Sequence, residues 1–252
     1  MKEYFMRTLS IICVLFLAAG CVNSKNQKQM LEEGPLQSIP SETPLPKDPQ
    51  RSAVMQERAR IINQQGMQAF DKRDYMRAVN LFGDAIRLHP TADYYCNLGR
   101  AYYFIGENNL AEQSLAKANE MQPNNPIILR NLGDVYRQWG DNEEAINYYH
   151  AAIKINPDFA PAHYELGNLF LKNGMFDQAE WRINRALQLQ PRFDKALLAR
   201  AILYYRTNRP EQSWGDIQKL ENYGFVVDKD FKAKVVAAVQ KDRSDALGRI
   251  RD

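Results

Sequence analysis

Apolar and small side chains recur along residues 59–193 in a pattern that repeats after 33 and then 34 residues. Each unit contains a glycine, an alanine twelve residues later, a second alanine seven residues after that, and a closing proline. The four series are Gly66, Gly99, Gly133 and Gly167; Ala78, Ala111, Ala145 and Ala179; Ala85, Ala118, Ala152 and Ala186; and Pro90, Pro123, Pro157 and Pro191. Small residues at fixed offsets predict stacked helical hairpins, because two helices that cross closely leave no room for a large side chain.

Large apolar residues complete the pattern, and the third unit shows it best. Its residues are Leu129, Leu132-Gly133, Tyr136, Ala145, Tyr149, Ala152 and Pro157. The pattern resembles the tetratricopeptide repeat, and the four units fall at 59–91, 92–125, 126–159 and 160–193. The resemblance implies an all-α fold, a superhelical α-solenoid of helical hairpins. One residue is missing between Pro90 and Gly99, so we expect a shorter connection there.

A degenerate fifth unit is expected at 194–224, completing an array over 51–224. Ser213 and Leu220 stand where the two alanines of the other units stand, and no proline closes the unit. Gly224 can instead end the last helix in a left-handed conformation.

Residues 225–252 are expected to form a capping helix and tail. Asp228 is a candidate N-cap for a helix that runs to about Leu247. Its apolar residues share one face: Phe231, Val235 and Val239. A terminal element is expected to drift from the repeat pattern because its outer side meets water.

Residues 1–20 resemble a bacterial lipoprotein signal peptide. After a short charged start, residues 9–17 are almost wholly apolar, a run too short to span a bilayer. The run leads into Leu17-Ala18-Ala19-Gly20-Cys21, although the family prefers leucine where Ala18 stands. In the lipoproteins that it resembles the cysteine is diacylated, so we expect a lipid on Cys21. The alternative is an ordinary secretory signal with an uninvolved cysteine.

Residues 21–50 are expected to form a flexible linker behind the lipidated cysteine. The segment is rich in proline and glutamine and has no apolar periodicity, so it cannot bury enough surface to fold. Val22 and Asn23 follow the cysteine, whereas an aspartate directly behind it retains many lipoproteins at the inner membrane. The resemblance therefore implies the periplasmic face of the outer membrane.

Charge and cysteine content exclude several classes of function. The chain carries a net charge of +3, and removal of Lys2, Glu3 and Arg7 (together +1) leaves +2, too little to indicate a nucleic-acid partner. Of three cysteines, only Cys96 falls outside the signal and the lipidation site, so no internal disulfide is expected.

Catalytic chemistry is not expected either. The only histidines are His89, His150 and His163, and none has a neighbouring ligand at metal-binding spacing. The repeated glycines are explained by helix crossings, so no phosphate-binding loop remains. We therefore expect no enzyme activity and no cofactor.

A protein-binding groove is implied by the resemblance, because the first helices of tetratricopeptide hairpins line the concave face. The residues predicted to lie in it are Asn97, Arg100, Tyr103, Arg130, Asn131, Asp134, Arg137, Tyr164 and Asn168. Amides can bond an extended backbone through donor and acceptor, and arginine can bind a carboxylate with two parallel bonds. The alternative is an ordinary solvated face, on which Arg130 and Asp134, four residues apart, pair with each other.

A lipid-tethered groove of this kind resembles bacterial tetratricopeptide lipoproteins that assist pilus or secretion-channel assembly, such as pilotins and the lipoprotein of tight-adherence pili. The resemblance implies a scaffold whose partner is a secretin or a pilus-assembly subunit. The lipid would raise the effective concentration of that partner at the membrane. The alternative is an adaptor that docks periplasmic cell-wall hydrolases or proteases.

Overall fold

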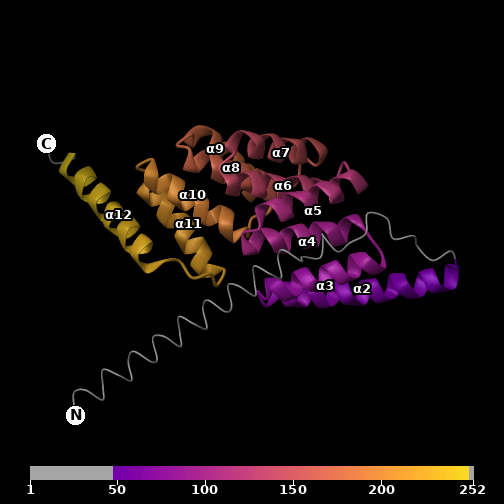
Figure 1. Ribbon diagram of the computed structural model, residues 1–252. Coiled ribbons are helices and arrows are strands. Elements are labelled where there is room, and N and C mark those ends of the chain that lie inside the picture. Colours follow the sequence, from indigo (N-terminus) through magenta and orange to yellow (C-terminus); the bar gives the residue numbers. More distant parts are fainter. Residues whose placement is uncertain (1–47, 250–252) are drawn as a thin grey trace, which may run out of the picture. The chain divides into compact units, whose positions relative to one another are not determined.

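A computed structural model describes residues 48–249, which form eleven α-helices and no strand (Figure 1). The predicted signal peptide, Cys21 and almost all of the predicted linker lie outside the described residues. The chain divides into two compact units, one ending at Ser114 and the other beginning at Leu115, so the boundary falls within a helix.

The first unit consists of helices that pack in chain order. Its helices are α2 (Pro49–Asp71), α3 (Tyr75–Leu88), α4 (Ala92–Ile105) and the beginning of α5 (Asn108–Met121). α2 packs along α3 and α3 packs along α4, while α2 also touches α4. The first helices of successive hairpins are therefore neighbours, as in a repeat array.

The second unit continues the same order. After the end of α5 its helices are α6 (Pro126–Trp139), α7 (Asn142–Ile155), α8 (Ala160–Lys172), α9 (Phe176–Leu189), α10 (Asp194–Arg206), α11 (Pro210–Asn222) and α12 (Lys229–Arg249). The helices α6, α8 and α10 are the first helices of their hairpins, and α8 touches both α6 and α10. This contact places three first helices side by side along the unit.

Three of the repeated glycines lie where a ring or a branched side chain of the second helix fills the space. A Cβ atom built on Gly66 would lie 2.6 Å from Cε1 of Phe82, and one on Gly133 would lie 2.6 Å from Cε1 of Tyr149. At Gly167 the corresponding distance to Cγ1 of Ile183 is 2.7 Å. The explanation of these glycines as close helix crossings is confirmed.

The position of the missing residue is also confirmed. The connection between α3 and α4 contains residues 89–91, whereas the equivalent connections contain the four residues 122–125, 156–159 and 190–193. Thr91 caps the shortened junction, since its hydroxyl accepts from the amide of Tyr94 at 3.2 Å.

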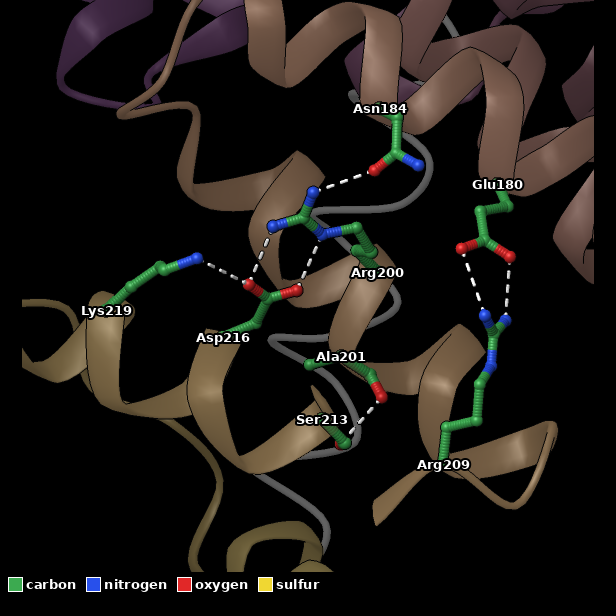
Figure 2. Close-up of polar contacts among 8 residues, drawn as sticks. All are labelled: Glu180, Asn184, Arg200, Ala201, Arg209, Ser213, Asp216 and Lys219. Carbon is green, nitrogen blue, oxygen red and sulfur yellow. Dashed lines mark hydrogen bonds and ion pairs between the residues drawn. The ribbon is translucent and has the colours of Figure 1, made fainter. Parts of the chain in front are cut away.

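Residues 194–222 form a helical hairpin despite the altered alanine positions. Ser213 is fully buried, and its hydroxyl donates to the carbonyl of Ala201 at 2.7 Å (Figure 2). Serine is nearly as small as alanine, and this bond satisfies the one polar group it adds. Leu220 is buried too, and Gly224 has a φ of 84° just beyond the end of α11.

The last helix packs against the hairpin before it. Asp228 accepts from the amide of Phe231 at 2.9 Å, as expected of an N-cap. Val235 and Val239 are buried in the core of the second unit, and Phe231 packs against that core. The predicted apolar face of this helix is confirmed.

Candidate functional site

In the first unit, the predicted binding residues lie on α4, beside α2. The amide of Asn97 donates to Oδ1 of Asn63 at 3.1 Å, so part of its hydrogen-bonding capacity joins the two helices. The guanidinium of Arg100 lies 4.8 Å from the ring centroid of Phe70 on α2. We call this surface the α2–α4 face.

Aromatic rings extend the α2–α4 face at one end. Tyr103 lies edge-on to Phe104 at 5.3 Å, and Phe104 stacks on Tyr75 at 4.9 Å between ring centroids. Phe104 keeps 50% of its surface exposed, although aromatic side chains usually bury more of it. An exposed ring supported by other rings is a rigid apolar contact for a partner.

In the second unit, the residues on α6 form one charged network. Nη1 of Arg130 donates to Oδ2 of Asp134 at 2.8 Å, so these two side chains pair as the alternative interpretation proposed. Arg137 lies on the same side, 3.8 Å from Oδ1 of Asp134. Asp134 and Asn131 are both buried, so only a small part of each can meet a partner.

Tyr149 of α7 contributes its hydroxyl to this network. Its hydroxyl donates to Oδ1 of Asp134 at 2.8 Å and accepts from Nε of Arg137 at 3.3 Å. The sequence identified Tyr149 only as a core ring. Burial, and then the Asp134 carboxylate, raise the pKa of its hydroxyl well above the usual range, so it stays a donor.

Glu165 of α8 faces the same network. Burial and the Asp134 carboxylate raise the pKa of Glu165 to about 7, although Arg137, Arg130 and Lys195 act in the opposite direction. Glu165 is not among the binding residues predicted from the sequence. Its environment could not be predicted from the spacing alone, because it depends on side chains from two other helices, α6 and α10.

Tyr164 and Asn168, the two predicted residues of α8, are half-buried and four residues apart, so they share one side of the helix. The ring of Tyr164 packs against Phe193 with 5.0 Å between centroids. Charges of Arg137, Asp134 and Asp194 act on its hydroxyl, which places it between α6 and α10.

A pocket that the sequence did not predict lies between α10 and the start of α12. Its volume is about 270 Å³. Its apolar lining is Leu198, Ile202, Leu220, Phe225, Val226, Val227 and Phe231. Asp194, Lys195 and Asp228 complete its wall. The sequence did contain a signal for this pocket. Ala201 stands where other units have Gly133 and Gly167, so Leu198 holds the position of Arg130 and Tyr164, and Ile202 that of Asp134 and Asn168.

The charged network on α6, the exposed side of α8 and the pocket beside α10 together form what we call the α6–α8–α10 face. It consists of Arg130, Asp134 and Arg137 on α6, Tyr164, Glu165 and Asn168 on α8, and Lys195, Leu198 and Ile202 on α10. Lys195 joins its two halves, because its charge acts on Glu165 and its side chain lines the pocket. The face therefore offers fixed charges beside an apolar pocket, a combination suited to holding a peptide segment.

A second polar cluster in this unit has a structural role. Arg200 donates to both oxygens of Asp216 at 2.7 and 2.8 Å and to Oδ1 of Asn184 at 2.7 Å (Figure 2). Arg200 stands where the second, third and fourth units have Leu98, Leu132 and Leu166. Its ion pair with Asp216 and its hydrogen bond to Asn184 therefore join α9, α10 and α11 at a position that is apolar in those three units.

Two of the histidines have structural partners. Nε2 of His163 lies 3.0 Å from the carbonyl of Pro157, and Arg182 bonds Nε2 of His150 at 3.1 Å. Among the described residues, no three His, Cys, Asp or Glu side chains are grouped so as to hold a metal ion. Nor does any helix in this part of the chain combine the length and apolarity needed to cross a bilayer.

Models of the tetratricopeptide repeat match residues 92–125, 133–174 and 164–216, the middle one under the description "TPR repeat". Together with the succession of helical hairpins, these matches show that the chain carries tetratricopeptide repeats between residues 92 and 216. Repeats of this class form scaffolds for interactions between proteins.

Relatives of known sequence are similar over part of their length. Human tetratricopeptide repeat protein 6 is 30% identical over 147 residues, which are 58% of this chain and 28% of that protein. The TPR repeat-containing protein MJ1428 of Methanocaldococcus jannaschii is 32% identical over 119 residues, which are 46% of this chain and 21% of that protein. The chain thus spans less than a third of either relative.

Solved structures share the fold at low sequence identity. Pseudomonas aeruginosa PilF has a TM-score of 0.64 at 21% identity, with 77% of this chain and 89% of that chain covered. PilW, described as a widely conserved type IV pilus biogenesis factor, has a TM-score of 0.62 at 22% identity, with 72% and 87% covered. TTC0263 of Thermus thermophilus has a TM-score of 0.62 at 23% identity, with 72% and 99% covered.

Proposed function

We propose that this protein is a non-enzymatic scaffold, tethered by a lipid on Cys21 to the periplasmic face of the outer membrane, that assists assembly of a pilus or secretion channel. It does so by holding a segment of an assembly subunit, such as a secretin, against its first helices. The lipid and the linker keep the protein at the membrane, and the repeats bind the partner.

The α6–α8–α10 face is the observation that carries the proposal. Fixed charges from two helices adjoin an apolar pocket on a third, and the side chains are held by Tyr149 and Asp134 before any partner arrives. Such preorganisation reduces the entropy lost on binding. The likeness to PilW, a type IV pilus biogenesis factor, supports the choice of a pilus.

Gene deletion in the bacterium that encodes the protein tests this function. We expect secretin multimers or pili to fail to assemble in the outer membrane and to reappear when the wild-type gene is restored. Restoration with Cys21→Ala should leave assembly defective, because the scaffold is no longer held at the membrane. Normal assembly in the deletion strain would overturn the proposal.

A pull-down with the wild-type protein separates the alternative. Recovery of cell-wall hydrolases in place of assembly subunits, lost with Arg100→Glu plus Arg130→Glu, would identify an adaptor instead.

A further inference from the structure

We infer that the α6–α8–α10 face recognises an acidic segment, whose carboxylate lies against Arg130 and Arg137 while a large apolar side chain fills the pocket between α10 and α12. This inference rests on the proposed function and specifies the chemistry of the bound segment. It uses only side chains within the second unit.

Charge at the α6–α8 end of the face determines the sign of the ligand. Arg130 and Arg137 contribute two positive charges at this end, against which stand Asp134 and a glutamate whose negative charge is disfavoured by burial, while Lys195 and its neighbour Asp194 on α10 offset each other. The side chains of Arg130 and Arg137 are partly exposed, so a ligand carboxylate can lie against them. It would balance the excess positive charge with charge-assisted hydrogen bonds.

The α10–α12 end determines the apolar part of the ligand. Leu198, Phe225 and Val226 leave 38%, 39% and 95% of their surfaces exposed around a cavity of about 270 Å³. A leucine, isoleucine or phenylalanine side chain of the ligand would cover this surface and remove its own apolar area from water, which favours binding. The cavity lies beside Lys195, so one short segment can occupy both ends of the face.

Glu165 links binding to protonation. The charged groups around it are Arg130, Asp134 and Arg137 from α6 and Lys195 from α10, with Tyr149 of α7 and Tyr164 of α8 as neutral neighbours, while α9 packs on α8 through Ile183 against Gly167. A ligand carboxylate adds negative charge, which favours the protonated form of Glu165. Binding at neutral pH should therefore take up a fraction of a proton, and affinity should rise as pH falls.

Selection from a phage-displayed library of random dodecapeptides tests the inference on the full chain carrying Cys21→Ala. We expect the enriched peptides to combine Asp or Glu with Leu, Ile or Phe. Calorimetry with the best peptide should show binding about tenfold weaker to Lys195→Glu plus Leu198→Glu. Both changed side chains are exposed, so the fold should persist.

The matched control is Lys154→Glu plus Ile155→Glu on α7. Ile155 is 39% exposed, as against 38% for Leu198, and the charge change is the same. Binding to this control should match the wild type. Calorimetry in phosphate and in Tris should show proton uptake by the wild type at about pH 7 and none by Glu165→Gln.

Two failures are distinguishable. Peptides that need Lys195 and Leu198 but carry basic or wholly polar sequences would overturn this inference and leave the proposed function standing. Peptides whose binding is the same for the α10 double variant and the α7 control would contradict both, because the partner would not lie on this face.

Discussion

At the residue scale, Gly133 shows why a glycine, with no side chain beyond a hydrogen atom, is needed where two helices cross. The ring of Tyr149 occupies the place of a side chain there, and its hydroxyl holds Asp134 at 2.8 Å. Packing at a helix crossing and the shape of the binding face are therefore set by the same ring.

Replacement of Gly133 by alanine should destabilise the protein by about 1–3 kcal/mol, because the new methyl group displaces the ring of Tyr149. Thermal unfolding checks the expected fall in Tm. Gly215→Ala is the control, since nothing lies within 4 Å of its added Cβ. That change should be neutral or stabilise by up to about 1 kcal/mol. Equal effects at the two sites would contradict the packing explanation.

Glu165 gives the protein a pH dependence with a defined sign. Its pKa of about 7 in the folded protein lies above the ordinary value of 4.5, so the folded state holds this proton more tightly than the unfolded state. The resulting stability is complete below about pH 4.5 and is lost as pH rises through about 7. We expect Tm of the wild type to fall over this range relative to Glu165→Gln.

Tm measured across that range for both proteins checks the expectation. Glu143→Gln, at an exposed carboxyl of α7, should follow the wild type. Parallel curves of Tm against pH for wild type and Glu165→Gln would show that Glu165 titrates alike in the folded and unfolded states, and would contradict the expectation.

Sequence reasoning at this scale gave positions but not environments. It placed Arg130, Asp134 and Arg137 on one side of a helix, because that follows from spacing. It did not give Glu165 or Tyr149 a polar role, since their surroundings come from other helices. The cap at Asp228 was predictable because it is a local hydrogen bond.

At the scale of elements, the fifth hairpin keeps its shape with different interactions. Arg200 replaces a leucine, and Asp216 on α11 supplies the matching carboxylate with only 3% of its side chain exposed (Figure 2). Repeat spacing predicted the helices of this hairpin and the positions of Leu198 and Ile202. It could not predict the ion pair, because that depends on a pair of residues that no other repeat contains. It could not predict the pocket either, because residues that complete it, such as Phe225 and Phe231, lie beyond the repeats.

Arg200→Leu should destabilise the protein by about 3–5 kcal/mol, because it leaves Asp216 buried beside Lys219 alone. The double change Arg200→Leu plus Asp216→Leu should recover most of that loss, since leucine fills this position in three other units. Chemical denaturation of both variants measures the difference. A double variant as unstable as the single one would show that the ion pair is not interchangeable with apolar packing.

At the scale of the whole molecule, the repeats and the predicted anchor have separate tasks. Each of the two compact units carries its own face of first-helix residues, the α2–α4 face in the first and the α6–α8–α10 face in the second. Period and composition were sufficient to predict the all-α repeat fold, because every repeat packs its two helices in the same way. The partner could not be predicted in the same way, since binding residues differ from unit to unit.

Site-specific photo-crosslinking in the living bacterium tests most directly whether the first helices hold the partner. Benzoylphenylalanine placed at Leu198 and at Asn168 should give a crosslinked protein of defined mass. The same residue at Ile155 of α7, which is 39% exposed as against 38% for Leu198, should give none. Crosslinks from Ile155 that are as strong as those from Leu198, or none from either first helix, would contradict binding on the α6–α8–α10 face.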